Sequence, residues 1–513
     1  MLLHDAFERN ARRLPDKLAL VCGEQRLSYA QLHRRVRALA QALRDDGVMP
    51  GDRVLLLLEN GVEFAVAVHA VLAAGAVFVP VSPLAKAEKL AFLAADTRAA
   101  ALLTQAQLQP SWAPALGGAA CLRVCRVAGE LGPDASDPRV QAWPTQDNSA
   151  EGDADRAPSP ARSEDDLAAL IYTSGTTGVP KGVMLTHANM TSALAAIQAY
   201  LAFREDDVVG LALPAAFSYG LSNLLLALAT GACVVLERWA AFPVKLAEVL
   251  ERERVTVFPG VPTLFAALLG LRDLSRFDLR ALRLLTNAAA VLPDAHAQRL
   301  GEALPQARLF SMYGLTECIR ASYLAPEQSA LRPGSVGRGI PNQAHWLVDE
   351  DGQRLPDGAV GELVVQGPHV MRGYWERPAE TALRLKPGPL PGERVLHTGD
   401  IFRSDSDGYL YFVSRQDDII KTRGEKVSPR EVENAIYRLD SVTGCAVVGV
   451  ADEAMGQAVK AYVTLRPGCG LGERDIIKHC LARLENYMAP KFVEIVDELP
   501  RTDSGKIRHA GLR

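Results

Sequence analysis

Short apolar runs alternate with segments of helical periodicity along most of the chain, and this alternation restricts the possible folds more than any other feature. The runs 53–58 and 76–81 are rich in Val and Leu and are typical of buried strands. Between them, residues 62–74 have apolar side chains at helical spacing. A strand, a helix and a second strand in this order predict βαβ units around a mainly parallel sheet. The alternation returns at 231–236 and 255–258, so we expect an α/β fold.

The composition agrees with a globular protein of several domains. Of the 513 residues, 48% are hydrophobic and 23% are charged, which excludes wholesale disorder and a polytopic membrane protein. Two uncharged stretches, 64–85 and 208–236, are long enough to span a bilayer. Glycine, proline and polar residues interrupt both of them. We therefore expect buried helices and strands there, and no membrane insertion.

Charge and cysteine usage favour a small-molecule or protein partner. The 56 basic and 60 acidic side chains give a net charge of −4, which provides no electrostatic reason to bind nucleic acid. The eight cysteines form neither a CxxC pair nor a Cys/His cluster. The N-terminal residues lack the apolar core of a signal peptide. We expect a cytoplasmic protein with reduced thiols.

The pattern changes beyond about residue 340. Three segments with hairpin spacing follow, each close to an Asp-Gly pair, and they predict a small β-barrel-like part. Further along, a helix, two strands and a second helix predict a compact α+β unit. We therefore expect a large N-terminal domain of βαβ-built sheets over residues 1–415 and a small C-terminal domain over residues 416–513.

The strongest local signal for function is the segment 172–182, with the sequence YTSGTTGVPKG, directly after the apolar run 167–171. Its glycines, hydroxyl groups and single lysine predict a loop that leaves a strand. Donor groups without a local acceptor are what a phosphate chain binds. The segment is not a Walker A loop, because Lys181 is followed by Gly182 instead of Ser or Thr. Taken alone, a flexible turn with an incidental lysine is the alternative.

With this segment and six others the chain resembles the adenylate-forming superfamily of acyl- and aryl-CoA synthetases, nonribosomal-peptide adenylation domains and beetle luciferase. The resemblance extends over nearly the whole length. The six further motifs, in the family's order, are 312–317 (MYGLTE), 361–363 (GEL), 373–375 (GYW), 397–400 (HTGD), 415–421 (RQDDIIK) and 500–506 (PRTDSGK). The resemblance implies the α/β fold expected above, with a C-terminal domain that is mobile.

The resemblance also implies an ATP-dependent reaction in two steps. A carboxylate attacks the α-phosphorus of ATP, pyrophosphate leaves, and a thiol then displaces AMP from the mixed anhydride. The first step brings anions together, so positive charge and Mg²⁺ must offset their repulsion. The implied enzyme is an AMP-forming acid–thiol ligase that uses ATP, Mg²⁺ and the pantetheine thiol of CoA.

The same resemblance implies roles for individual residues. Lys506 would bridge the substrate carboxylate and the α-phosphate, Thr316 would donate to the α-phosphate, and Glu317 would hold the magnesium ion. Asp400, which only accepts hydrogen bonds when ionised, would bind the ribose hydroxyls, and the ring of Tyr313 would pack on adenine. The expected ATP- and AMP-binding residues are Thr173, Ser174, Gly175, Thr176, Thr177, Lys181, Ala288, Tyr313, Thr316, Asp400 and Arg415.

Asp417 aligns with the family's hinge residue. One pose of the small domain would bring Lys506 to ATP, and the other would present residues 422–426 to the thiol. Two poses are needed because a site that encloses ATP leaves no room for a thiol donor. Gly424 would allow close approach of the pantetheine arm, with Lys426 beside it. An ordinary interdomain loop capped by Asp417 is the alternative.

Departures from the family pattern concern the acyl substrate. Phe217 occupies the position of a histidine found in many fatty acyl-CoA synthetases, and Tyr219 belongs to a segment that resembles benzoate-type ligases. Amino-acid-activating domains use an aspartate at the position of Gly220, and a buried ammonium without that carboxylate is costly. With Val261 and Tyr323, these residues predict a neutral, partly aromatic pocket for an aromatic or a short to medium aliphatic acid, not an α-amino acid.

Other functions remain open from the sequence. A freestanding adenylation enzyme could load the same pantetheine arm on an acyl or peptidyl carrier protein. A luciferase-type enzyme would react the adenylate with oxygen, although no residue specifically supports this. A non-catalytic nucleotide-binding relative is disfavoured because the expected phosphate, magnesium and lysine positions are intact.

Overall fold

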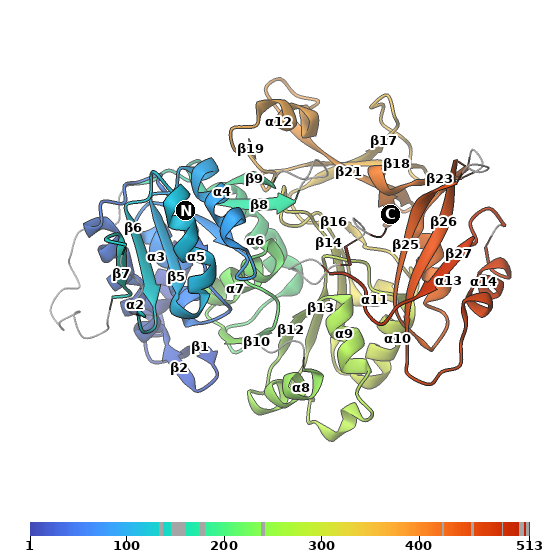
Figure 1. The fold of residues 1–513 in the computed structure, drawn as a ribbon, viewed down its shortest axis with the longest axis horizontal. Helices are drawn as coiled ribbons and strands as arrows, with labels where there is room; N and C mark the ends of the chain where they lie inside the picture. The colour runs from blue at the N-terminus through green and yellow to red at the C-terminus, as the bar shows by residue number, and fades with distance from the viewer. Residues whose placement is uncertain are drawn as a thin grey trace.

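The described part of the chain folds into four β-sheets and the helices that cover them (Figure 1). It is seen in a computed structural model. The residues that the structure describes are 1–132, 137–144, 161–174, 180–237, 242–422, 425–452, 456–484, 486–501, 507–508 and 512.

An eight-stranded sheet in the order β19-β9-β8-β4-β3-β5-β6-β7 carries the expected phosphate segment. Its strands are β3 (Arg53–Leu57), β4 (Val77–Val81), β5 (Ala101–Gln105), β6 (Val124–Ala128), β7 (Val140–Ala142), β8 (Leu167–Ser174), β9 (Pro180–Thr186) and β19 (Gly373–Tyr374). Strands β3 and β4 are parallel neighbours, which confirms the predicted βαβ unit. Strand β19 pairs antiparallel with β9, so Tyr374 lies opposite Val183 although nearly two hundred residues separate them in sequence.

A nine-stranded sheet has the order β16-β15-β14-β13-β12-β10-β11-β1-β2. Its strands are β1 (Leu18–Cys22), β2 (Gln25–Ser28), β10 (Val208–Leu211), β11 (Cys233–Leu236), β12 (Val257–Gly260), β13 (Leu284–Asn287), β14 (Arg308–Tyr313), β15 (Ser322–Leu324) and β16 (Arg338–Gly339). Strands β12, β13 and β14 are parallel. Their carboxyl ends therefore meet at one edge of the sheet, which is where open α/β sheets bind ligands.

Helices fill the space between the two large sheets and cover their outer faces. They are α1 (Asp5–Arg13), α2 (Tyr29–Asp45), α3 (Val62–Ala73), α4 (Ala87–Thr97), α5 (Gln109–Ala115), α6 (His187–Leu201), α7 (Ser218–Thr230), α8 (Pro243–Arg252), α9 (Pro262–Leu269), α10 (Asp294–Ala303), α11 (Pro326–Ser329) and α12 (Pro378–Arg384). Helix α3 contacts β1 of one sheet and β3 and β4 of the other, and nearly all of its residues are buried.

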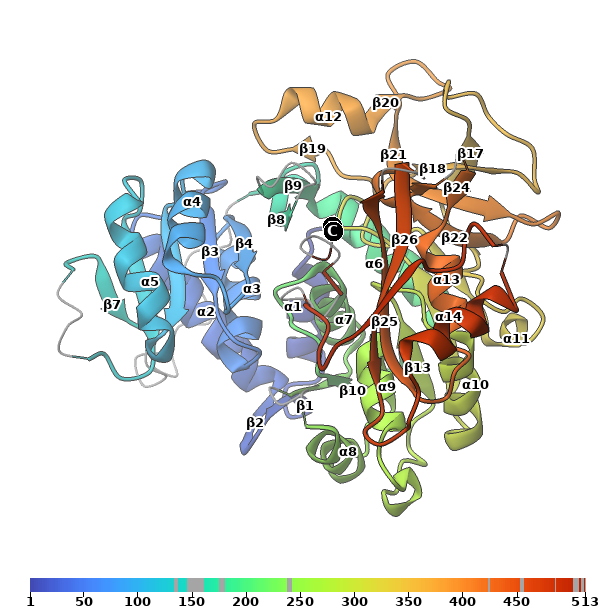
Figure 2. The same cartoon turned by 45° about the vertical axis from the view of Figure 1, so that its right-hand side comes forward.

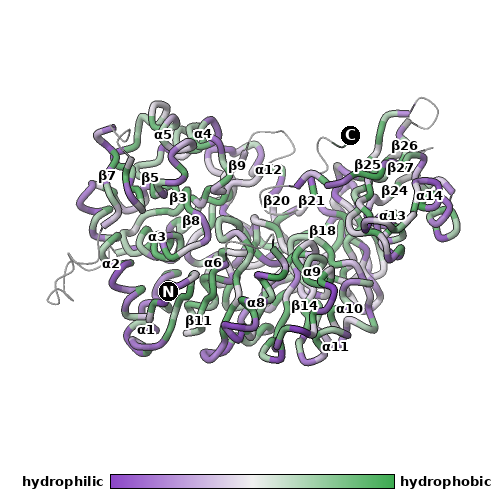
Figure 3. Tube along the Cα trace, turned by 60° about the horizontal axis from the view of Figure 1, so that its bottom comes forward, coloured by the Kyte–Doolittle hydropathy of each residue, from purple (hydrophilic) through white to green (hydrophobic). Residues whose placement is uncertain are grey.

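The two uncharged stretches therefore belong to the interior, as predicted. The first forms α3 and β4, and the second forms β10, α7 and β11. Among the described residues no helix combines the length and the apolar character that a membrane span requires. Hydrophobic segments gather inside the molecule, and hydrophilic ones lie outside, for example at α14 (Glu473–Leu481) (Figure 3).

Two smaller sheets follow in the chain, in agreement with the predicted change of pattern. The first consists of β17 (Ala344–Val348), β18 (Val360–Gln366), β20 (Leu385–Pro387), β21 (Arg394–Ser404) and β22 (Leu410–Arg415), all antiparallel. The second consists of β23 (Ile420–Thr422), β24 (Glu425–Val427), β25 (Val442–Asp452), β26 (Gly456–Leu465) and β27 (Phe492–Ile495), covered by α13 (Pro429–Ile436) and α14. The last sheet has its own hydrophobic core and lies at one side of the molecule (Figures 1 and 2).

Candidate active site

The two ends of the expected phosphate segment are paired strands and not a loop. Strand β8 continues through Ser174, β9 begins at Pro180, and Thr173 pairs with Lys181 across the hairpin. The prediction of a loop over 172–182 is therefore wrong in its extent. Strand pairing satisfies the backbone groups that composition alone leaves without partners. The expected ligands Gly175, Thr176 and Thr177 lie outside the described residues.

The base of this hairpin is fixed by contacts to distant elements. The Tyr172 hydroxyl donates to the Asp96 carboxylate at the end of α4, and Arg377 Nη2 forms an ion pair with the same carboxylate at 2.6 Å. The backbone N–H of Trp375 donates to the Gly182 carbonyl at 2.7 Å, and the Trp375 indole N–H donates to the Asp96 carbonyl at 3.1 Å. These contacts hold both strands of the hairpin in a defined position.

A single tyrosine lies between the expected phosphate lysine and the expected metal carboxylate. The Tyr374 hydroxyl donates to Glu317 Oε1 at 2.8 Å, and Lys181 Nζ lies 5.8 Å from the centroid of the same ring. Burial and the neighbouring Glu317 carboxylate raise the pKa of Tyr374, so its hydroxyl remains a donor. The 373–375 motif is part of the family resemblance, but no role was predicted for Tyr374. The pairing of β19 with β9 brings Tyr374 near Lys181, and a 2.7 Å hydrogen bond from the backbone N–H of Met371 to the Glu317 carbonyl accompanies its contact with Glu317.

The acidic side chains are consistent with a magnesium ion that arrives with a nucleotide. No group of three or more His, Cys, Asp or Glu side chains with metal-binding geometry occurs in the described part of the chain. Glu317 provides one half-buried carboxylate on the loop between β14 and β15. Magnesium commonly takes one or two carboxylates from a protein and fills its other positions with phosphate oxygens and water. Glu317 therefore fits this ion, with neighbouring Thr316 half-buried on the same loop.

The expected ribose and adenine residues form one hydrogen-bonded network. The Tyr313 hydroxyl donates to Asp400 Oδ2 at 2.6 Å, and Arg415 Nε lies 3.4 Å from Asp400 Oδ1. Asp400 and Arg415 face each other on β21 and β22. Burial raises the pKa of Asp400, and the Arg415 charge opposes that rise. The network holds a buried carboxylate beside the tyrosine expected at adenine.

A second carboxylate, that of Glu362, binds the part of β21 directly before Asp400. Glu362 Oε1 accepts from the backbone N–H of Gly399 at 2.8 Å, and Glu362 Oε2 lies 3.0 Å from His397 Nδ1. Burial alone would raise the pKa of Glu362, but these two donors lower it below its ordinary value. The motifs 361–363 and 397–400 are both part of the family resemblance, but no role was predicted for Glu362. The two residues are 35 positions apart, and nothing in the sequence indicates that they come into contact.

The segment after β13 adopts an unusual backbone conformation. Ala289 has φ 71°, in the left-handed region that is uncommon for residues other than glycine. Asn287 Nδ2 donates to the Ala290 carbonyl at 2.9 Å, while the buried Asn287 Oδ1 has no partner among the described residues. Ala288, expected near adenine, is buried.

The expected acyl-pocket residues come from two helix starts at the edge of the nine-stranded sheet. Phe217 precedes α7, Val261 precedes α9, and Tyr219 lies in the first turn of α7. The Tyr219 hydroxyl lies 2.9 Å from the Thr286 carbonyl on β13. The half-buried Tyr323 stacks on Tyr200 of α6, with ring centroids 3.9 Å apart. Aromatic side chains thus lie among the expected pocket residues, and the acyl pocket itself stays a prediction.

Gly220 is required by close packing. A Cβ at this position would lie 2.5 Å from the Pro214 carbonyl oxygen and 3.1 Å from the Ala215 Cα. Both are backbone atoms, so any side chain at residue 220 would force the chain to shift. The carboxylate that α-amino acid activation needs at this position therefore cannot be accommodated in this backbone.

Several expected residues are not placed. Lys506 and Gly424 lie outside the described residues. Asp417 lies in a short 3₁₀ turn, Gln416–Asp418, directly after β22, and Lys426 lies on β24; for these two and for Ser174 only the backbone is described. The hinge and the division at residue 415 stay predictions.

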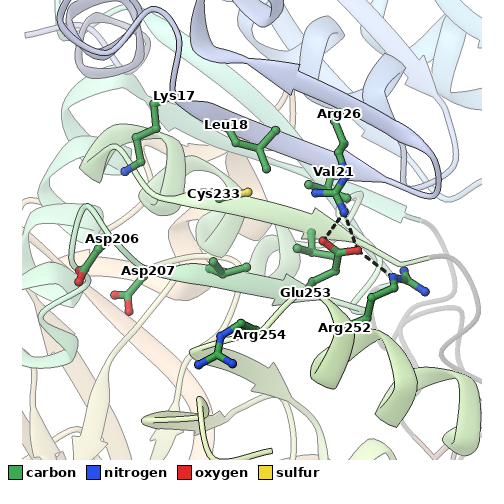
Figure 4. A pocket seen from close by; sticks show the side chains of 12 residues that line it. Lys17, Leu18, Val21, Arg26, Asp206, Asp207, Cys233, Arg252, Glu253 and Arg254 are labelled. Atoms are coloured by element: carbon green, nitrogen blue, oxygen red, sulfur yellow. Dashed lines mark hydrogen bonds and ion pairs between the residues drawn. The ribbon is translucent and has the colours of Figure 1, made fainter. Parts of the chain in front are cut away.

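A surface pocket of about 370 Å³ lies elsewhere, beside β1 and β11 (Figure 4). One of its carboxylates, Glu253, is neutralised by Arg26 at 2.7 Å and Arg252 at 2.9 Å. Burial raises the pKa of Cys233, at this pocket, to about 12, so the thiol is not a nucleophile at neutral pH. We assign no chemistry to this pocket.

Comparisons with known proteins agree with the geometry. The model of the AMP-binding enzyme family matches residues 7–375, and that of the AMP-binding enzyme C-terminal domain matches residues 431–506. The chain is 34% identical to 3-[(3aS,4S,7aS)-7a-methyl-1,5-dioxo-octahydro-1H-inden-4-yl]propanoyl:CoA ligase of Rhodococcus jostii, over 99% of this chain and 97% of that protein. It is 35% identical to a feruloyl-CoA synthase of Amycolatopsis, over 98% and 97%.

Solved structures extend the likeness to the whole fold. The anthranilate CoA ligase AuaEII, solved with anthranoyl-AMP, has a TM-score of 0.90 and 28% identity over 100% of this chain and 96% of that one. A benzoate CoA ligase from Burkholderia xenovorans has a TM-score of 0.87 and 28% identity, with 100% of each chain covered. The family model covers most of this chain, and relatives above 30% identity cover nearly all of it. The chain therefore belongs to the AMP-binding enzymes of the adenylate-forming superfamily.

Proposed function

We propose that this chain is an AMP-forming acid–CoA ligase that activates a carboxylic acid as its adenylate and transfers the acyl group to the thiol of CoA. The observation that carries the proposal is the position of Tyr374, whose hydroxyl binds Glu317 and whose ring lies beside Lys181. The cation expected to bind phosphate and the carboxylate expected to bind the metal thus both contact Tyr374. The relatives that are CoA ligases support the same reaction.

The residues of the chain bind and orient the reactants in the first step. Asp400 accepts hydrogen bonds from the ribose hydroxyls, and Tyr313 and Arg415 hold its carboxylate in place. Lys181 and residues 173–177 bind the β- and γ-phosphates, and Thr316 donates to the α-phosphate. Glu317 would hold Mg²⁺, which neutralises phosphate charge when bound.

The small domain separates the two steps. In this proposal residues 416–513 turn about Asp417, so that Lys506 reaches the reacting carboxylate in one pose and residues around Gly424 and Lys426 meet the pantetheine arm in the other. We expect Lys506→Ala to slow adenylate formation by about 100-fold or more. Thiol transfer from preformed adenylate should change much less. Equal losses in both steps would contradict the two-pose arrangement.

The proposed substrate is an aromatic or short to medium aliphatic acid. The aromatic wall around Tyr219 and the exclusion of a side chain at Gly220 support this class and disfavour α-amino acids. The ligases for feruloyl, benzoyl and anthraniloyl groups among the relatives agree with it.

Transfer to a carrier protein is the second candidate, because the same pantetheine arm serves both acceptors. One relative, tyrocidine synthase 3 of Brevibacillus parabrevis, is 32% identical over 99% of this chain, which spans only 8% of that protein. Three curated relatives that match over 90% or more of their own length are CoA ligases, which favours CoA.

The test is acid-dependent exchange of labelled pyrophosphate into ATP across a panel of carboxylic acids. Competition between CoA and phosphopantetheinyl carrier proteins for the preformed adenylate then identifies the acceptor. We expect exchange with aromatic or aliphatic acids, no exchange with α-amino acids, and thioester formation with CoA. Absence of exchange with every acid would contradict the proposal, and oxygen uptake would indicate luciferase-type chemistry instead.

A further inference from the structure

A buried arginine lies on the same loop as the expected catalytic residues. Arg320 follows Glu317 by three positions, between β14 and β15, and only 2% of its surface is exposed. Its guanidinium lies 5.0 Å from the centroid of the Tyr219 ring, a residue of the expected acyl pocket. Arg320 therefore lies between the residues expected at the α-phosphate and those expected at the acyl group.

The charge of Arg320 is not neutralised by the described part of the chain. Its guanidinium forms no ion pair with any described carboxylate, and its buried Nε has no hydrogen-bond partner among the described residues. Its neighbours are phenols: burial raises the pKa of Tyr219 to about 12, and the guanidinium opposes that rise, as it does at Tyr200. A buried guanidinium without an anionic partner is costly, and buried polar groups without partners are rare in native proteins.

The backbone around Arg320 is strained in a way that fixes its position. Ile319 has φ 61°, which is a genuine outlier for a β-branched residue. A Cβ at Gly314 would lie 2.5 Å from the Ile319 carbonyl oxygen and 2.9 Å from the Arg320 Cα. Only glycine lets the loop fold back this closely. Strain of this kind persists where the surroundings impose it, and it is concentrated at functional sites.

We propose that Arg320 determines substrate specificity by binding a second oxygen acceptor, preferably a carboxylate, on the acyl part of the acid. The inference rests on the proposed function and narrows its substrate class from aromatic or aliphatic acids in general to those that carry such an acceptor. The Nε–H donates to the acceptor oxygen, and a carboxylate also neutralises the guanidinium charge. The ring of Tyr219 and the acceptor then contact the cation together.

The test compares matched acids with and without a second acceptor: pentanoate, levulinate and glutarate, which have equal carbon number, and benzoate beside benzene-1,3-dicarboxylate, which has one more carboxyl group on the same ring. Pyrophosphate exchange is measured for the wild type, Arg320→Met and Arg320→Lys. We expect the wild type to favour the better diacid over its matched monoacid by about 10- to 100-fold in kcat/KM, with levulinate between. Arg320→Met should abolish or reverse this preference, and Arg320→Lys should retain part of it.

A structural or a general catalytic role predicts different results. If Arg320 bound the reacting carboxylate, Arg320→Met would lower exchange equally for every acid. If it only supported the fold, the variant would unfold at lower temperature and its acid preference would not change, whereas removal of an unpaired buried charge should leave stability unchanged or increased. Either result, or a wild type that uses monoacids at least as well as diacids, overturns the inference while leaving the proposed ligase activity intact. Absence of exchange with all acids overturns both.

Discussion

The adenosine side and the acyl side of the candidate site differ in how their buried charges are satisfied. Around Asp400, each described carboxylate oxygen has a partner, in Tyr313 and Arg415. Around Arg320, a buried cation lacks an anionic partner among the described residues. The adenosine side is therefore organised before any ligand binds, while the acyl side depends on the substrate to complete it. This agrees with an enzyme family that shares one nucleotide and varies its acids.

The largest effect is expected at the centre of the adenosine side. Asp400→Asn removes the charge that is proposed to accept from the ribose and leaves Arg415 unpaired, so kcat/KM for ATP should fall by about 100-fold. Tyr313→Phe is the matched control, because it removes only the 2.6 Å hydrogen bond to Asp400. Its loss should be about tenfold or less, with the acidic limb of the pH profile moved to higher pH, since that hydrogen bond lowers the pKa of Asp400. Equal kinetics for Asp400→Asn and wild type would end the ribose assignment.

On the acyl side, the tightest packing is expected at Gly220. Gly220→Ala places a Cβ against the Pro214 carbonyl oxygen, and the resulting backbone shift should lower the free energy of unfolding by about 2 kcal/mol. Denaturant titration measures this change. Gly301→Ala is the control, because no heavy atom lies within 4 Å of a Cβ built there. If Gly220→Ala leaves the stability unchanged, position 220 can hold a larger side chain, and the argument against amino-acid substrates fails.

Between the two sides lies the expected metal carboxylate. Glu317→Gln should raise the magnesium concentration needed for half-maximal pyrophosphate exchange by about tenfold. Tyr374→Phe, which removes only the hydroxyl that donates to Glu317, should cause a smaller shift in the same direction. An unchanged magnesium titration in Glu317→Gln would remove Glu317 from its assigned role.

The smallest effect concerns Glu362, which supports Asp400 indirectly. Because the pKa of Glu362 is lowered in the folded protein, its contribution to stability is present above its unfolded pKa, about 4.3, and is lost as the pH falls through the folded value. Glu362→Gln should therefore lose about 1 kcal/mol near neutral pH and approach the wild type in acid. Unfolding midpoints at neutral and acidic pH measure this. A difference that is independent of pH would contradict the ionised hydrogen bonds of Glu362.

The sequence predicted the architecture well because periodicity is a local property. Strands β3 and β4, the buried helix between them and the hairpins after residue 340 follow from the spacing of apolar residues and Asp-Gly turns. The strand pairing of residues 172–174 with 180–182 was missed, because composition does not reveal the cross-strand partners of backbone groups.

The site was predicted as a set of motifs, but the contacts between motifs were not. Glu362 meets His397 because β18 pairs with β21, and Tyr374 meets Glu317 because the segment before β19 contacts the loop between β14 and β15. No role was predicted for Arg320. An arginine in a sequence is normally a solvated side chain, and its burial without a carboxylate is a property of the folded chain.

The most direct test of the central claim follows the oxygen atoms of the acid. If a carboxylate oxygen attacks the α-phosphorus at the site formed by Lys181, Glu317 and Asp400, one labelled oxygen passes to AMP when the thioester forms. An acid that supports pyrophosphate exchange is therefore labelled with oxygen-18 in its carboxylate and turned over with ATP and CoA, and the AMP is analysed by mass spectrometry. The account predicts AMP carrying one oxygen-18 atom. Unlabelled AMP, or label found in pyrophosphate or orthophosphate, would contradict it.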